Sequence, residues 1–194
     1  MLVTEIIKLI NSKLKELAFS TATTYGISEL VPVTDKDERV VLVPTVIDNF
    51  GEGIEMSLES FDDILFYYRL NTKTTTYNKF QYGDSNKEIT DTYQLSMFVS
   101  VNRTRLKKSA ADVSEIISAW IPDVIKMNDK QVAIITQGLY DFNSQSIINS
   151  EFPNTEYAGM PDIFMIRQDL QIKQAYRRRC LVTCEKECNN YSTN

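Results

Sequence analysis

The stretch from Thr90 to Met127 constrains the fold most, because its pattern changes from the period of a strand to the period of a helix. Between Asp91 and Asn102, large apolar residues alternate with polar residues, which predicts a half-buried strand. The polar side of this strand has one large apolar exception, Phe98. The apolar side carries Tyr93, Leu95, Met97, Val99 and Val101.

An amphipathic helix is predicted from Ala110 to Ile125. Ser109 to Asp112 has the form of a capping box at its start. Pro122 removes a backbone donor, so we expect a kink or a restart of the helix there. The apolar residues recur at the i, i+3, i+4, i+7 spacing and form one stripe that would lie across a sheet. These residues are Val113, Ile116, Ile117, Trp120, Ile121, Val124 and Ile125.

Before this stretch, the chain predicts a first helix and two strands. Leu2 to Phe19 has apolar residues at helical spacing, which favours a helix that covers a sheet over one that lies on a membrane surface. Ile27 to Val33 and Arg39 to Ile47 are typical of two strands joined by a polar turn. Pro32 and Pro44 cannot donate to a ladder, so we expect these strands to lie at a sheet edge or to be interrupted at the prolines.

Further strands are predicted from Phe61 to Leu70 and from Gln131 to Phe142, and the second is apolar enough to lie centrally in the sheet. Ile163 to Leu170 and Gln171 to Thr183 indicate one broken strand or two short strands that close the domain. The segment between Asn143 and Pro161 is expected to be an irregular connection.

These elements predict an α+β fold: a mixed or antiparallel β-sheet flanked by two amphipathic helices, with an extended β-hairpin arm. We expect a single domain over residues 1–183, with insertions near residues 71–89 and 143–161. Residues 184–194 form a polar C-terminal tail.

The arm is expected between Asn71 and Ile89, where Tyr77, Lys79, Phe80 and Tyr82 interleave aromatic and basic side chains. Such interleaving is found on nucleic-acid stacking surfaces. A β-ribbon that contacts a neighbouring subunit is the favoured interpretation, because the chain as a whole is acidic.

Composition excludes several classes of protein. The formal charge is −5, from 26 acidic and 21 basic residues, which argues against a general nucleic-acid binder. The chain has no histidine, so the commonest general base and metal ligand are missing. No apolar run is long enough to cross a membrane, and we expect a cytosolic product without a signal peptide.

The chain offers no recognisable catalytic or metal-binding motif. Its three cysteines, Cys180, Cys184 and Cys188, are spaced four apart, without a CxxC pair or a fourth ligand. We expect reduced thiols, although a crosslink with a neighbouring molecule stays open. No P-loop, GxGxxG, GxSxG or EF-hand pattern occurs. We therefore expect no enzyme, no cofactor and no metal; an acid-pair hydrolase without histidine is the weaker alternative.

Basic residues cluster in two further places. The first is the join between strand and helix, with Arg103, Arg105, Lys107 and Lys108, and the second is Arg177, Arg178 and Arg179. They could bind phosphates or an acidic partner subunit, or they could be a solvated surface. A nucleic-acid-binding module is therefore the alternative function, with the candidate residues Lys73, Lys79, Arg103, Arg105, Lys107, Lys108, Arg177 and Arg179.

The order of elements resembles the tail-terminator and tail-completion subunits of tailed bacteriophages and the related neck ring proteins. The residues that carry this resemblance are the helix from Leu2 to Leu17, Tyr82-Gly-Asp followed by Thr92 to Val101, and the helix from Asp112 to Ile125. The resemblance covers about the core two-thirds of the chain. The sequence is rich in Asn, Lys and Tyr, which resembles proteins from AT-rich phage genomes such as those of crAss-like phages.

The resemblance implies a structural virion protein that forms a ring of six copies in tails or twelve in necks. Such a ring joins the capsid portal to the tail and lets DNA pass through its lumen. Its partners would be further copies of itself and neighbouring portal, neck or tail proteins, with no membrane. The protein would be made in the host cytoplasm and reside in the neck or tail of the virion.

Overall fold

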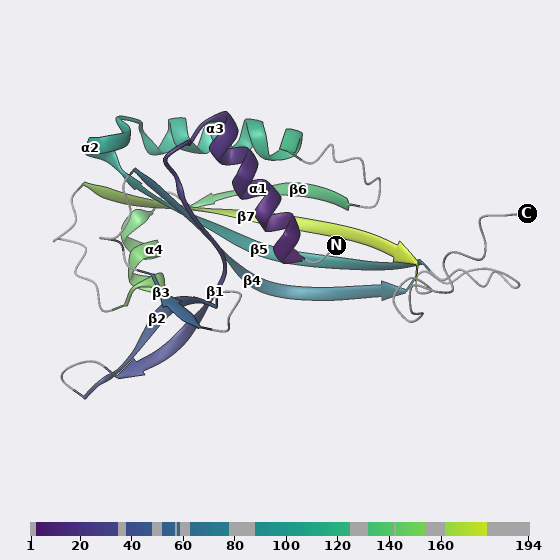
Figure 1. Ribbon diagram of the computed structural model, residues 1–194, viewed down its shortest axis with the longest axis horizontal. Helices are drawn as coiled ribbons and strands as arrows, with labels where there is room; N and C mark the ends of the chain where they lie inside the picture. The colour runs from purple at the N-terminus through teal and green to yellow at the C-terminus, as the bar shows by residue number, and fades with distance from the viewer. Residues whose placement is uncertain are drawn as a thin grey trace, which may run out of the picture.

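The computed structural model describes residues 3–34, 38–47, 52–56, 58, 63–77, 88–124, 132–141, 143–153 and 162–177. The strand predicted from Asp91 to Asn102 is present and lies inside the sheet as β5 (Glu88–Asn102). It pairs antiparallel with β4 (Ile64–Tyr77) on one side and with β7 (Ile163–Arg177) on the other. β5 is therefore the strand around which the sheet is built (Figure 1).

The sheet has seven strands in the order β3-β2-β1-β4-β5-β7-β6, which confirms the predicted α+β class with a mixed sheet. The pairing of β1 with β4 is parallel, and the other pairings are antiparallel. The remaining strands are β1 (Thr23–Thr34), β2 (Val40–Ile47), β3 (Gly53–Glu55) and β6 (Val132–Asp141).

The two predicted helices lie on one face of the sheet. They are α1 (Val3–Leu17) and α3 (Ala110–Val124), which pack against each other, with α1 against β1 and α3 against β6 and β7. Their stripes are buried where predicted, since Ile10, Leu14, Val113 and Ile117 are fully buried. α3 continues through Pro122 to Val124, so the helix does not restart there, and the kink stays a prediction.

The opposite face is covered in part by a helix that the sequence analysis missed, α4 (Ser144–Glu151). Its start is capped by Asn143, whose side chain accepts a hydrogen bond from the Ser146 amide at 3.2 Å. α4 lies in the region expected to be an irregular connection. Phe98 points to this face and stacks on Tyr67, with 5.0 Å between ring centroids. β5 is consequently buried on both faces around Phe98 rather than half-buried.

Two further expectations are corrected, and a third is not confirmed. β6 lies at the edge of the sheet and not at its centre, because β7 occupies the position between β5 and β6. β7 is one continuous strand to Arg177 rather than a broken one. The arm predicted over residues 71–89 is not confirmed, since residues 71–77 continue β4, residues 88–89 belong to β5, and residues 78–87 lie outside the described part.

Candidate assembly interface

The second half of β1 and all of β2 form a hairpin that leaves the body of the sheet (Figure 1). β1 pairs with β4 only between Thr23 and Ile27, where the register shifts, and with β2 between Ser28 and Thr34. Among the described strands, none pairs with the outer edge of β1 beyond Ile27. We call residues 28–34 and 40–47 the projecting hairpin.

The projecting hairpin is apolar on both faces. Residues directly opposite each other in an antiparallel pair share a face, so the register divides the side chains into two groups. In the register, Pro32 lies opposite Leu42 and Val31 opposite Val43. The first face carries Leu30, Pro32, Val40, Leu42 and Pro44, and the second carries Val31, Val33, Val41 and Val43.

Three of these side chains are exposed, those of Pro32, Val40 and Leu42, whereas Leu30 and the four valines of the second face are half-buried. Val40 is 73% exposed and Leu42 is 44% exposed. An isolated two-stranded hairpin is only marginally stable in water, and contiguous exposed apolar surface marks an interaction site. The open outer edge of β1 beyond Ile27 and the exposed apolar side chains together make this ribbon the candidate interface of the molecule, although β3 pairs with the base of β2 from Thr45 to Ile47.

A second feature adjoins the hairpin, an open cleft of about 630 Å³ between α1 and the base of the hairpin. Asn11 joins its walls, because Nδ2 donates to the Tyr25 carbonyl oxygen at 2.9 Å and Oδ1 accepts from the Tyr68 hydroxyl at 2.8 Å. Burial raises the pKa of Tyr68, so its hydroxyl remains a donor. The apolar lining comes from Ile7, Ile27, Val46, Ile47 and Ile54, and the basic lining from Lys8 and Lys15.

The predicted basic join folds into a single helical turn, α2 (Arg103–Leu106), at one end of β5. Asn102 caps this turn by accepting from the Arg105 amide at 3.2 Å. The guanidinium of Arg103 lies 5.0 Å from the centroid of the Phe164 ring. Lys107 ends the turn with a φ of 53°, and Lys107 and Lys108 are exposed. The join is an ordered basic corner.

The predicted contact residue Tyr77 lies at the other end of the β4–β5 ladder and is 63% exposed. Nearby, the Lys73 ammonium is 3.1 Å from a carboxylate oxygen of Asp91, and this hydrogen bond raises the pKa of Lys73. Strands rise about 3.3 Å per residue, so the length of β5 separates Tyr77 from Arg103 by roughly 45 Å. The structure therefore does not bring the two predicted contact regions together.

Several predicted residues lie outside the described part of the chain. They are Lys79, Phe80, Tyr82, Arg178, Arg179, Cys180, Cys184 and Cys188. Arg177 ends β7, where its backbone is opposite Glu88 at the same end of the sheet as Tyr77.

A buried carboxylate at the end of α4, Glu151, pairs with Arg69, and neither residue was among the predicted site residues. Both carboxylate oxygens of Glu151 approach Arg69, with N–O distances of 2.7 Å, and the Arg69 guanidinium lies 5.6 Å from the Phe98 ring centroid. The Tyr67 hydroxyl donates to Glu151 at 3.4 Å. Glu151 is 1% exposed, and burial raises its pKa. The only available signal was Arg69, a charge within the otherwise apolar run that begins at Ile64.

Neither a scan against protein-family models nor a search of curated proteins returns a match for this chain. Among the described residues, no group of three or more acidic, cysteine or histidine side chains could hold a metal ion. The described helices include none that is long and apolar enough to cross a membrane.

Proposed function

We propose that this protein is a ring-forming structural subunit of the neck or tail of a tailed bacteriophage, a head–tail connector or tail terminator. It acts without turnover, by joining the capsid portal to the tail around the DNA channel. The observation that carries the proposal is the projecting hairpin, apolar on both faces and, among the described strands, without a partner along the outer edge of β1 beyond Ile27. The resemblance of the element order to tail-terminator and neck ring subunits supplies the identity of the assembly.

The shape of the hairpin favours assembly by identical contacts around a ring. An extended ribbon reaches a neighbour at a surface different from its own, which makes the contact heterologous. Heterologous contacts close into rings when the rotation between neighbours permits. Burying Val40 and Leu42 in such a contact removes apolar area from water, which stabilises the contact by about 25 cal/mol for each Å² buried.

The charge of the chain suits a channel through which DNA moves. A formal charge of −5 per subunit repels the phosphate backbone, and this repulsion is multiplied by the number of copies in the ring. A lumen of this sign keeps DNA from binding to the wall.

Native mass spectrometry and negative-stain electron microscopy of the purified protein test the proposal. We expect closed rings, and we expect Val40→Asp/Leu42→Asp to give monomers because both aspartates would be buried without a partner. Ala111→Asp, an exposed change in the first turn of α3, is expected to leave the rings intact. A wild-type protein that stays monomeric at high concentration, both alone and with portal or tail proteins, would contradict the proposal.

The alternative, a nucleic-acid-binding module, is supported by the exposed basic corner at Lys107 and Lys108. Lys73, another of its candidates, already pairs with Asp91 at the opposite end of the ladder. The candidate cations are thus divided between two ends of the sheet, which is a weak arrangement for one phosphate-tracking surface. Binding to DNA that falls steeply with salt and is lost in Lys107→Glu/Lys108→Glu would favour this alternative.

A further inference from the structure

We infer that Pro32 guards the outer edge of β1 in the projecting hairpin against the addition of a strand from another molecule. Partners of the hairpin then contact its exposed side chains and do not extend its ladder along β1. Such a guard goes beyond the proposed function, because it acts whatever the number of copies in an assembly.

A single hydrogen bond at the base of the hairpin shows which way the backbone of each residue points. The Met56 amide donates to the Pro44 carbonyl oxygen at 2.8 Å, so this carbonyl is directed to the β3 side of β2 and away from β1. Pro44 lies opposite Leu30, and this pair is therefore a non-hydrogen-bonded one. The two kinds of pair alternate along an antiparallel ladder, so the pair of Pro32 with Leu42, two residues on, is of the same kind.

The backbone of Pro32 consequently points away from β2, to the outer edge of β1. Leu30 and Thr34 point the same way, since each lies two residues from Pro32 in the strand. Leu30 and Thr34 each have one N–H and one C=O to offer an added strand, whereas Pro32 between them has only its C=O. A strand added here would leave one of its own carbonyls without a donor in the middle of the ladder.

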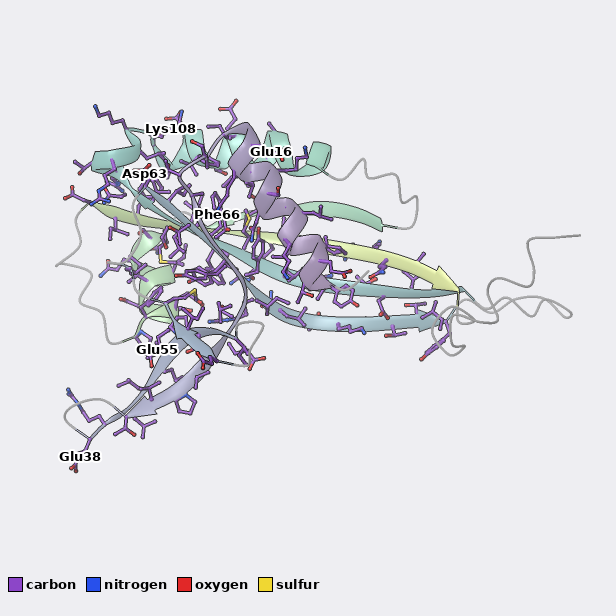
Figure 2. The ribbon with its side chains drawn as sticks, in the orientation of Figure 1. Glu16, Glu38, Glu55, Asp63, Phe66 and Lys108 are labelled. Carbon is purple, nitrogen blue, oxygen red and sulfur yellow. The ribbon has the colours of Figure 1, made fainter. Side chains whose placement is uncertain are left out.

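β3 covers only the base of the hairpin. Figure 2 shows Glu55, in β3, beside this base and Glu38 at the free end. β3 pairs with β2 from Thr45 to Ile47, and beyond this stretch none of the described strands pairs with the outer edge of β2. The backbone groups of β2 that are directed outward there belong to Val40 and Leu42.

The outer edge of β1 is the longer of the two edges and the one that strand addition would favour. Its outward positions are Leu30, Pro32 and Thr34, and they alternate with Val31 and Val33. Apolar segments of high strand propensity that lack proline are the ones that form ladders between molecules. Pro32 is exposed and lies at the middle of this edge, so it interrupts the segment where a ladder would otherwise run.

Moving the proline along the strand tests the guard. Pro32→Thr restores an N–H at the middle of the edge with a residue that favours strands. We expect this variant to associate, with thioflavin T fluorescence, at a protein concentration about tenfold below that of the wild type, because one more ladder hydrogen bond is made. Pro32→Thr/Thr34→Pro shifts the proline to the next outward position and is expected to return association to the wild-type level. Sedimentation velocity over a concentration series measures each protein.

Two further variants control for the substitution itself. Pro153→Thr makes the same change at an exposed proline that lies outside the strands, just after α4, and is expected to behave as the wild type. Pro32→Ala restores the same N–H without a β-branched side chain and is expected to associate as Pro32→Thr does. Circular dichroism of every variant checks that the fold is retained.

Each outcome supports or overturns the role of Pro32. Variants Pro32→Thr and Pro32→Ala that associate no more than the wild type would overturn it. The same holds if Pro32→Thr/Thr34→Pro associates as strongly as Pro32→Thr, or if Pro153→Thr gives an equal gain. None of these results bears on whether the wild type forms rings, and a wild type that stays monomeric leaves the comparison between variants intact.

Discussion

Glu151 carries the clearest electrostatic consequence at the scale of a single residue. Burial raises its folded pKa above the ordinary value of 4.5, even though Arg69 opposes the shift. A raised carboxyl pKa means that the folded state binds more protons than the unfolded state in the window above pH 4.5. The contribution of Glu151 to the free energy of unfolding therefore falls as the pH rises through that window.

We predict that wild-type protein loses stability relative to Glu151→Gln as the pH rises above about 4.5, because glutamine does not titrate. The difference should reach about 1.4 kcal/mol for each unit that separates the folded and unfolded pKa values. Urea unfolding at a series of pH values measures it. Asn149→Ala, an exposed change on α4 that removes no titratable group, serves as the control and should give a constant difference. A wild type that gains stability over Glu151→Gln across the same range would show that Arg69 outweighs burial.

At the scale of elements, the start of α3 was predicted closely. The Ser109 hydroxyl accepts from the Asp112 amide at 3.1 Å, and the Asp112 carboxylate accepts from the Ser109 amide at 3.0 Å, which confirms the capping box. The Ser109 hydroxyl also donates to the Asp112 carboxylate at 2.7 Å, and this bond, together with the one from the Ser109 amide, lowers the pKa of Asp112. Both partners are local in sequence, so a local motif was sufficient to predict the contact.

Ser109→Ala is predicted to lower the free energy of unfolding by about 1 kcal/mol, because an amide at the start of α3 loses its side-chain acceptor. Ser118→Ala is the matched control on the same helix. The Ser118 hydroxyl donates to the Ser114 carbonyl oxygen at 2.7 Å, a bond inside the helix whose loss costs little. Urea unfolding of both variants checks the expectation, and equal effects would argue against a capping role for Ser109.

At the scale of the whole molecule, assembly through the projecting hairpin couples stability to concentration. Binding that is specific to the folded state adds about 2.7 kcal/mol when the free partner is at 100 times the dissociation constant. We predict that the Tm of the wild type rises by several degrees over a hundredfold increase in protein concentration. Val40→Asp/Leu42→Asp should show no such rise, and differential scanning calorimetry gives both values. Parallel behaviour of the two proteins would mean that the hairpin does not mediate association.

Much of the secondary structure followed from the sequence because its signals are periodic and local. The alternation in β5 and the apolar stripes of α1 and α3 correctly predicted which side chains are buried on one face, including Val99, Ile10 and Ile117. Phe98, the apolar exception on the polar side of β5, belongs to a second hydrophobic core that includes residues of α4. α4 was missed, because its eight residues give too short a pattern to distinguish from a polar connection.

The candidate interface differs from the contact surfaces that the sequence favoured, which stay predictions. The sequence indicated a hairpin at Ile27 to Ile47 with prolines at a sheet edge, but it favoured residues 71–89 and the basic join as the contact surfaces. Exposure decides which apolar strand is an interface, and exposure depends on what the rest of the chain covers. Val40 and Ile64 look alike in sequence, yet Val40 is 73% exposed and Ile64 is fully buried.

By itself, the sequence determined the α+β class and the strand-to-helix stretch at β5 and α3, because hydrogen bonding and side-chain period act over neighbouring residues. Only the tertiary structure decided the order of the strands. β7 lies between β5 and β6, which leaves the apolar β6 at the edge of the sheet. The pairing of β1 with β4 ends at Ile27, after a register shift between Thr24 and Ile27, and the rest of β1 belongs to the projecting hairpin. Strand order depends on contacts between distant segments, for which the local pattern carries no information.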